Sequence, residues 1–201
     1  DVLMANDPYW GGSHLPDMCM YKPIFYEDEL LFWAVNKCHM ADCGGPVGGG
    51  YNPMAEDIYA EGLRIPPIKI QERGKMRRDV FELILTNVRT RAAQRGDMGA
   101  QSSALGVAER NLLGLVKRYG KQQVKDCVEE LIDRGDMRMR EEISKMPDGV
   151  YEGSSMMEDD LHGSGDLQIK CIATIKGSDL EIKLEAPPQI KSHRNSYRAN
   201  S

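Results

Sequence analysis

The 201-residue sequence lacks several features that would define a function class. Its formal net charge is −5 and no dense basic patch stands out, which argues against a nucleic-acid partner. No run of about 18 apolar residues could cross a membrane, and no secretory signal is present. The five cysteines are an odd number without tight periodic spacing, which argues against a disulfide framework, and the lack of a C-x-x-C pair disfavours a zinc ribbon. We therefore expect a cytoplasmic protein that binds neither nucleic acid nor membrane.

A nucleotide-binding signature is also missing. The phosphate-cradling pattern G-x-x-x-x-G-K-[ST] does not occur, although residues 44–50 contain five glycines. We expect this segment to be a loop whose backbone approaches another group closely, and we expect ATP to be handled elsewhere. The chain begins with Asp1 rather than Met and continues at once into an apolar run, so we expect it to be an internal portion of a larger protein.

Three compositional zones predict an α+β fold. Residues 1–69 are rich in glycine, proline and short apolar runs. Residues 18–25 and 30–37 are predicted to form two strands joined by the acidic turn 26–29, and the apolar stretch 30–35 suits a buried strand. Residues 70–146 carry apolar side chains three and four positions apart, which predicts about three helices. Residues 147–201 return to strands and contain a β-hairpin.

Glycines and turn residues set the expected boundaries inside these zones. Gly96 followed by Asp97 predicts the end of one helix and the N-cap of the next, and Gly120 predicts a second break. In the last zone, Gly177 predicts the turn of the hairpin. The strand at 180–184 alternates apolar and charged residues, which is typical of a half-buried strand.

Two of the four histidines stand in the same His-x-x-Asp pattern, His14 with Asp17 and His39 with Asp42. Imidazole and carboxylate groups together suit Zn, Mn or Fe. If the two predicted strands pair as a hairpin, Asp17 before the first strand lies beside His39 after the second, and His14 is one short step away. We therefore predict that these three residues bind one divalent ion. The alternative is that each Asp caps a turn and each His packs locally.

Other residues near this pattern are candidates for chemistry. Cys38 and Cys43 flank the second His-x-x-Asp pair and are either a nucleophile or, more commonly, buried thiols. Arg64 could grip a carboxylate or phosphate through two hydrogen bonds, or it could form an internal ion pair with Glu61. Asp7 could supply a further oxygen to the metal, or it could hydrogen-bond to a metal-binding residue and orient it.

Taken in order, these segments resemble the hydantoinase B/oxoprolinase family. That family includes N-methylhydantoinase B, the C-terminal half of 5-oxoprolinase, and the acetone and acetophenone carboxylase subunits. Two departures stand out: Cys38 replaces the first of two adjacent histidines that members often carry, and residues 185–189 lack the usual glycine-containing loop. The resemblance covers nearly the whole chain, through residues 6–9, 11–17, 36–45, 61–67, 87–90, 96–101 and 147–151.

The resemblance implies the catalytic subunit of an ATP-dependent hydrolase of cyclic amides. A hydantoinase A-type partner subunit or domain would use ATP to phosphorylate the cyclic amide, and the divalent metal would lie in this chain. One alternative is a subunit of a ketone carboxylase acting on acetone or acetophenone, and a second is a non-catalytic scaffold with a structural metal. The implied site comprises metal ligands His14, Asp17 and His39 and catalytic candidates Asp7, Asp42, Glu61 and Arg64.

Overall fold

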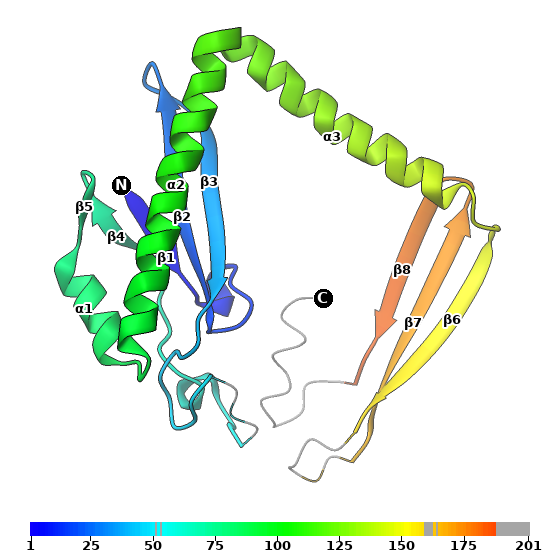
Figure 1. Cartoon of the computed structure of the whole chain (residues 1–201). Helices are drawn as coiled ribbons and strands as arrows, with labels where there is room; N and C mark the ends of the chain where they lie inside the picture. Colours follow the sequence, from blue (N-terminus) through cyan, green and yellow to red (C-terminus); the bar gives the residue numbers. More distant parts are fainter. Residues whose placement is uncertain (51, 53, 159–162, 164, 188–201) are drawn as a thin grey trace. The chain divides into compact units, whose positions relative to one another are not determined.

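The computed structural model describes residues 1–50, 52, 54–158, 163 and 165–187 (Figure 1). The fold is α+β, as predicted, with helices in the middle of the chain and a sheet on either side in sequence. The described chain divides into two compact units, residues 1–114 and residues 115–187. No helix of the described part is long and apolar enough to span a membrane.

The first unit contains, in chain order, β1 (Val2–Ala5), η1 (Pro8–Trp10), β2 (Asp17–Tyr26), β3 (Glu29–His39), η2 (Ile58–Ala60), β4 (Ile68–Glu72), β5 (Lys75–Met76), α1 (Arg78–Thr86) and α2 (Arg91–Tyr119), which continues into the second unit. Its strands form a five-stranded antiparallel sheet in the order β3-β2-β1-β4-β5. The predicted β2–β3 hairpin is confirmed, and its turn places Glu27 and Asp28 at positive φ, +50° and +64°, as tight hairpin turns require.

One face of this sheet carries the hydrophobic core. Alternate side chains of β1, β2 and β4 are fully buried with residues of α1 and α2, namely Met4, Met18, Met20, Ile24, Ile70, Ile84, Leu85, Met98 and Leu105. The expectation of a buried strand at 30–35 is wrong. β3 is an edge strand, and its successive side chains point to opposite faces of the sheet. Ala34 faces the core, whereas Trp33 and Val35 point to the open face and are half exposed.

Helix α2 runs without a break through Gly96 and Asp97, so the predicted helix end at these residues is wrong. A glycine inside a helix costs only about 1 kcal/mol relative to alanine. Packing outweighs this cost, because a stripe of α2 side chains is buried on both sides of the glycine: Gln94, Met98, Gln101 and Leu105. Tertiary contacts here override the local signal.

The second unit contains the end of α2, α3 (Lys121–Ile143) and a three-stranded sheet of β6 (Gly149–Met157), β7 (Leu167–Lys176) and β8 (Asp179–Glu185). The predicted break at Gly120 is confirmed by its positive φ of +88°, and the predicted hairpin is the β7–β8 pair. The expectation of a half-buried strand at 180–184 is wrong, because Leu180, Ile182 and Leu184 are all exposed among the described residues.

The predicted division of the larger subunit at residues 69 and 146 stays a prediction. Within the described chain, β4 pairs with β1, and α2 passes from one compact unit to the other. Of the segment 185–189 that departs from the family pattern, residues 188 and 189 lie outside the described residues.

Candidate active site

The β2–β3 hairpin places Asp17 opposite His39. β2 begins at Asp17 and β3 ends at His39, and the two residues are direct partners in the ladder. The Nδ1 atom of His39 lies 2.7 Å from Oδ1 of Asp17, a hydrogen bond. Hairpin closure therefore brings together two groups that are far apart in sequence, as the sequence pattern predicts. The contact leaves Nε2 of His39 directed away from the carboxylate.

The second oxygen of Asp17 is also engaged. Its Oδ2 accepts hydrogen bonds from Ser13 Oγ at 2.7 Å and from Lys37 Nζ at 3.0 Å. Lys37 precedes His39 by two residues, so both side chains lie on the same face of β3. Burial alone would raise the pKa of Asp17, but the hydrogen bonds from Ser13, His39 and Lys37 outweigh it and bring the pKa to about 2. Asp17 is therefore a carboxylate at neutral pH.

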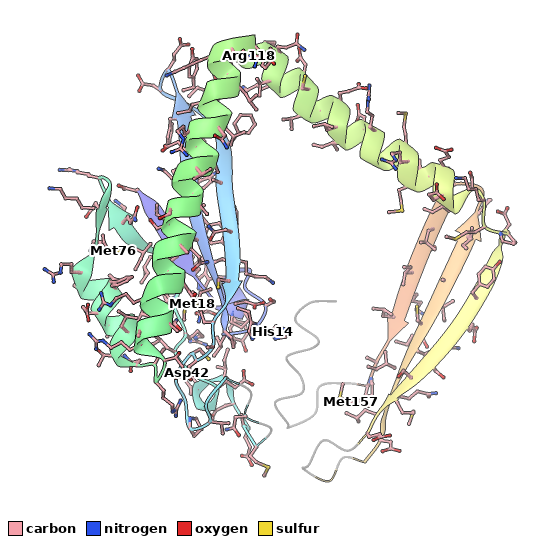
Figure 2. All side chains as sticks on the ribbon, viewed as in Figure 1. His14, Met18, Asp42, Met76, Arg118 and Met157 are labelled. Atoms are coloured by element: carbon pink, nitrogen blue, oxygen red, sulfur yellow. The ribbon has the colours of Figure 1, made fainter. Side chains whose placement is uncertain are left out.

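His14 lies next to this pair, at the end of the sheet where β2 begins (Figure 2). Its ring centroid is 6.5 Å from that of His39, and the rings meet edge to face at 74°. The loop that carries His14 is held by two backbone hydrogen bonds, from Asp17 N to His14 O at 2.9 Å and from Met40 N to Pro16 O at 2.8 Å. The second bond attaches the loop to the chain that follows His39.

Asn6 ties three segments of the site together. Its buried side-chain nitrogen donates to Leu15 O at 2.7 Å and to Leu63 O at 2.9 Å, and its oxygen accepts from Ile65 N at 2.6 Å. The two carbonyls belong to the neighbours in sequence of His14 and Arg64. One amide group therefore sets the His14 loop beside the segment that carries Arg64. Sequence reasoning included Asn6 in a family-like segment without giving it a role.

Asp7 and Arg64, both predicted site residues, form an ion pair. Nε of Arg64 lies 3.3 Å from Oδ2 of Asp7, while Oδ1 of Asp7 accepts from Tyr9 N at 3.0 Å. The alternative pairing of Arg64 with Glu61 is not the one found. Glu61 is instead partly buried without an ionic partner among the described residues, and burial raises the pKa of its carboxyl group.

Asp42 is bound by protein groups. It is buried and accepts hydrogen bonds from the backbone and guanidinium of Arg89 and from Gly44 N. Burial alone would raise its pKa, but these donors and the Arg89 charge hold the pKa below its usual value. Arg89 also donates to Gly45 O at 2.6 Å. Asp42 thus fastens the glycine-rich loop to the segment between α1 and α2, and its predicted catalytic role stays a prediction.

The glycine-rich loop packs against protein backbone, as its composition suggests. A Cβ atom on Gly44 would lie 2.7 Å from Asn87 O, so this approach is open to glycine only. Cys43, just before it, is fully buried, and burial raises the pKa of its thiol to about 11. Burial also raises the pKa of Cys38. Both thiols are protonated at neutral pH, which favours the interpretation as buried thiols over that as a nucleophile.

The donor chemistry of His14 and His39 fits a divalent ion. A histidine that binds a metal commonly holds a carboxylate on its other ring nitrogen, as His39 holds Asp17. Two imidazoles on one tetrahedral ion have centroids about 5 Å apart, given metal–nitrogen bonds of about 2.0–2.1 Å, so the rings at 6.5 Å need to close by about 1–2 Å. Among the described residues, no group of three His, Cys, Asp or Glu is already arranged to hold an ion.

Residues 1–201 match the hydantoinase B/oxoprolinase family model, and the chain belongs to that family. The chain is 50% identical over 201 residues to caprolactamase subunit beta of Pseudomonas jessenii, covering 100% of this chain and 35% of that protein. It is 27% identical to the acetophenone carboxylase delta subunit of Aromatoleum aromaticum, covering 98% of this chain and 29% of the relative. The chain thus spans about a third of the length of these two relatives.

Two solved structures share the fold. The crystal structure of the ATP-dependent caprolactamase from Pseudomonas jessenii superposes with a TM-score of 0.89 at 50% identity, covering 96% of this chain and 33% of that one. A nucleotide-free acetone carboxylase structure superposes with a TM-score of 0.87, covering 99% of this chain and 29% of that one. At 19% identity, the second likeness concerns the fold alone.

Proposed function

We propose that the chain is part of the catalytic subunit of an ATP-dependent amidohydrolase that opens a cyclic amide. The observation that carries this proposal is the 50% identity, along the whole chain, to the beta subunit of caprolactamase. An amide is a poor electrophile, and phosphorylation turns its oxygen into a leaving group. A hydantoinase A-type partner subunit or domain would carry out that ATP-dependent step, in keeping with the absence of a P-loop pattern from this chain. A cytoplasmic location is part of the proposal.

In this proposal His14 and His39 hold a divalent ion, with Asp17 beside them. When bound, the ion would lower the pKa of a water and polarise the activated substrate. Asp17 fixes the ring of His39 through Nδ1 and supplies negative charge. Lys37 lies on Oδ2 of Asp17, where its ammonium provides the positive charge that an ion would bring. For Asp17 to be a direct ligand, as predicted, this exposed lysine would have to withdraw.

Reconstitution tests the proposed reaction. The full-length protein that contains this chain is mixed with its ATP-using partner, ATP and one of three cyclic amides: caprolactam, hydantoin or 5-oxoproline. We expect ring opening that requires both ATP and the partner. Ring opening by the lone subunit without ATP would contradict the proposal.

Metal analysis tests the site separately from the reaction. A His39→Ala variant of the full-length protein should lose most of its divalent metal, whereas Asn87→Ala, an exposed position at the end of α1, should keep it. Full metal occupancy and unchanged turnover in His39→Ala would count against the site. Four protein ligands around the ion with no open position would instead favour a structural metal.

The second candidate is a ketone carboxylase subunit, favoured by the 27% identity to the acetophenone carboxylase delta subunit over nearly the whole chain. The same reconstituted complex is incubated with labelled bicarbonate and acetone or acetophenone. Label in a stable acid would support the carboxylase. ADP release that occurs only with a cyclic amide would support the amidohydrolase.

A further inference from the structure

Two short turns of the same design each bring a tyrosine ring against Arg64. In each, an aspartate caps a 3-10 helix and accepts a hydrogen bond from a tyrosine two residues on: Asp7 from Tyr9 N at 3.0 Å, and Asp57 from Tyr59 N at 2.9 Å. Each turn presents its tyrosine outward, and both tyrosine side chains are 77% exposed. Both rings are therefore accessible at the surface of the first unit.

The guanidinium of Arg64 stands against both rings. Its Cζ atom is 5.8 Å from the centroid of Tyr9 and 5.3 Å from that of Tyr59, within the range of cation–π contacts. The Asp7 carboxylate pairs with Nε and fixes the side chain from one edge. The ion pair engages Nε, so the two terminal nitrogens of this guanidinium lie outside that contact.

Arg89, the other arginine close to the loops of the site, shows the contrast. Its guanidinium already donates to Asp42 and to Gly45 O. Arg64 is instead held through Nε and by its two ring contacts, which leave its terminal nitrogens outside the ion pair. A side chain ordered in advance loses little entropy when a ligand binds. The Asn6 hydrogen bonds place the Arg64 segment next to the His14 loop, so a group bound to Arg64 lies beside the candidate active site.

We propose that Tyr9, Arg64 and Tyr59 form a clamp for an oxyanion carried by the substrate. A guanidinium fork matches the spacing of two oxygens in a phosphoryl or carboxylate group. The two rings add cation–π contacts that hold the guanidinium in place. Under the proposed function, the oxyanion belongs either to the phosphorylated amide or to the carboxylate of the opened ring. The identity of the molecule that bears the oxyanion rests on the proposed function. The clamp itself does not depend on that function.

Calorimetric titration tests the clamp without turnover. The full-length protein, without ATP or partner, is titrated with inorganic phosphate and with 6-aminohexanoate, the amino acid formed by opening caprolactam. We expect millimolar binding of at least one. Arg64→Lys keeps the charge but loses the fork and should weaken binding at least tenfold, while Arg73→Lys, exposed in the β4–β5 turn, should bind as the wild type does.

A second variant protects the test against misfolding. Tyr9→Leu combined with Tyr59→Leu alters two exposed side chains. This double variant should bind the same anion several-fold more weakly than the wild type does. If these variants lose the binding of phosphate that the wild type shows, the clamp is assigned to a phosphoryl group. If they lose the binding of 6-aminohexanoate, it is assigned to a carboxylate. Equal affinities in wild type, Arg64→Lys and the double variant, or no binding of either anion to the wild type, would overturn the clamp. Retained Arg64-dependent binding without cyclic amide hydrolysis would overturn only the proposed function.

Discussion

The Asn6 side chain should be critical for stability, because its fully buried amide group hydrogen-bonds to three backbone groups from two other segments. Replacement by alanine removes all three hydrogen bonds and leaves Leu15 O, Leu63 O and Ile65 N without this partner. A net hydrogen bond is worth about 1 kcal/mol, and an unsatisfied buried group costs about 1–3 kcal/mol. We therefore expect Asn6→Ala to lower the free energy of unfolding by about 3–5 kcal/mol, out of a total of about 5–15 kcal/mol for a typical domain.

Asn6→Asp separates hydrogen bonding from packing, because it keeps the shape of the side chain. The two N–H donors are replaced by an oxygen that faces the carbonyls of Leu15 and Leu63. A buried carboxylate against two carbonyl oxygens is unfavourable, so this variant should be at least as unstable as Asn6→Ala at neutral pH. Its deficit should shrink in acid, where the buried carboxyl group is protonated and can donate once.

Urea denaturation of the full-length protein, followed by fluorescence, measures these effects as shifts of the midpoint. Asn87→Ala is the matched control, since it removes one exposed hydrogen bond, from Nδ2 to Leu83 O, and should cost less than about 0.5 kcal/mol. Turnover measured below the unfolding range should fall for both Asn6 variants, because the His14 loop and the Arg64 segment lose their common support. Midpoints of the Asn6 variants that match that of Asn87→Ala would refute the reasoning.

Three further changes follow from the same loops. Gly62→Ala places a Cβ atom 2.7 Å from Cys43 O at a φ of +144° and should destabilise by about 2 kcal/mol or more, whereas Gly48→Ala, with open space around it, should be nearly neutral in thermal denaturation. Asp42→Asn should cost about 2–3 kcal/mol at pH 7. The stability from the Asp42 carboxylate is fully present above its ordinary pKa of 3.8 and is lost as the pH falls through its lowered folded-state pKa, so wild type and variant midpoints should converge in acid. Lys37→Met removes the ammonium from Asp17 and should tighten divalent-ion binding several-fold in chelator competition. An unchanged affinity would contradict the idea that the ammonium and the ion compete for the Asp17 carboxylate.

The parts of the site that sequence could predict are those set by local geometry. A hairpin is defined by alternation and by its turn, so the pairing of Asp17 with His39 followed from where the two strands begin and end. The close packing of the glycine loop followed in the same way, because only glycine tolerates such backbone approaches. Each of these inferences needed no knowledge of segments distant in sequence.

The parts that sequence missed depend on segments brought together by the tertiary fold. Nothing near Asn6 indicates that its amide will meet residues 63–65, which are more than 50 positions away. Arg64 has an acidic neighbour three residues before it, yet it pairs with Asp7 from another loop. Local periodicity also failed at Gly96, where the burial of Gln94 and Met98 keeps α2 continuous. Such choices are made by packing, which a single sequence does not display.

The distribution of hydrogen bonds separates residues that build the site from those that remain available to act in it. The polar atoms of Asn6 bond to backbone groups of neighbouring loops, and those of Asp42 bond to backbone groups and to the Arg89 guanidinium. Substitution of either residue should therefore reduce stability and activity together. His39 and Arg64 are each oriented by one aspartate, and each keeps nitrogen atoms outside that contact. Their substitution should therefore reduce activity or ligand binding with little change in the unfolding midpoint. That contrast distinguishes a reactive centre at the end of the β2–β3 hairpin from a set of loops that is merely well packed.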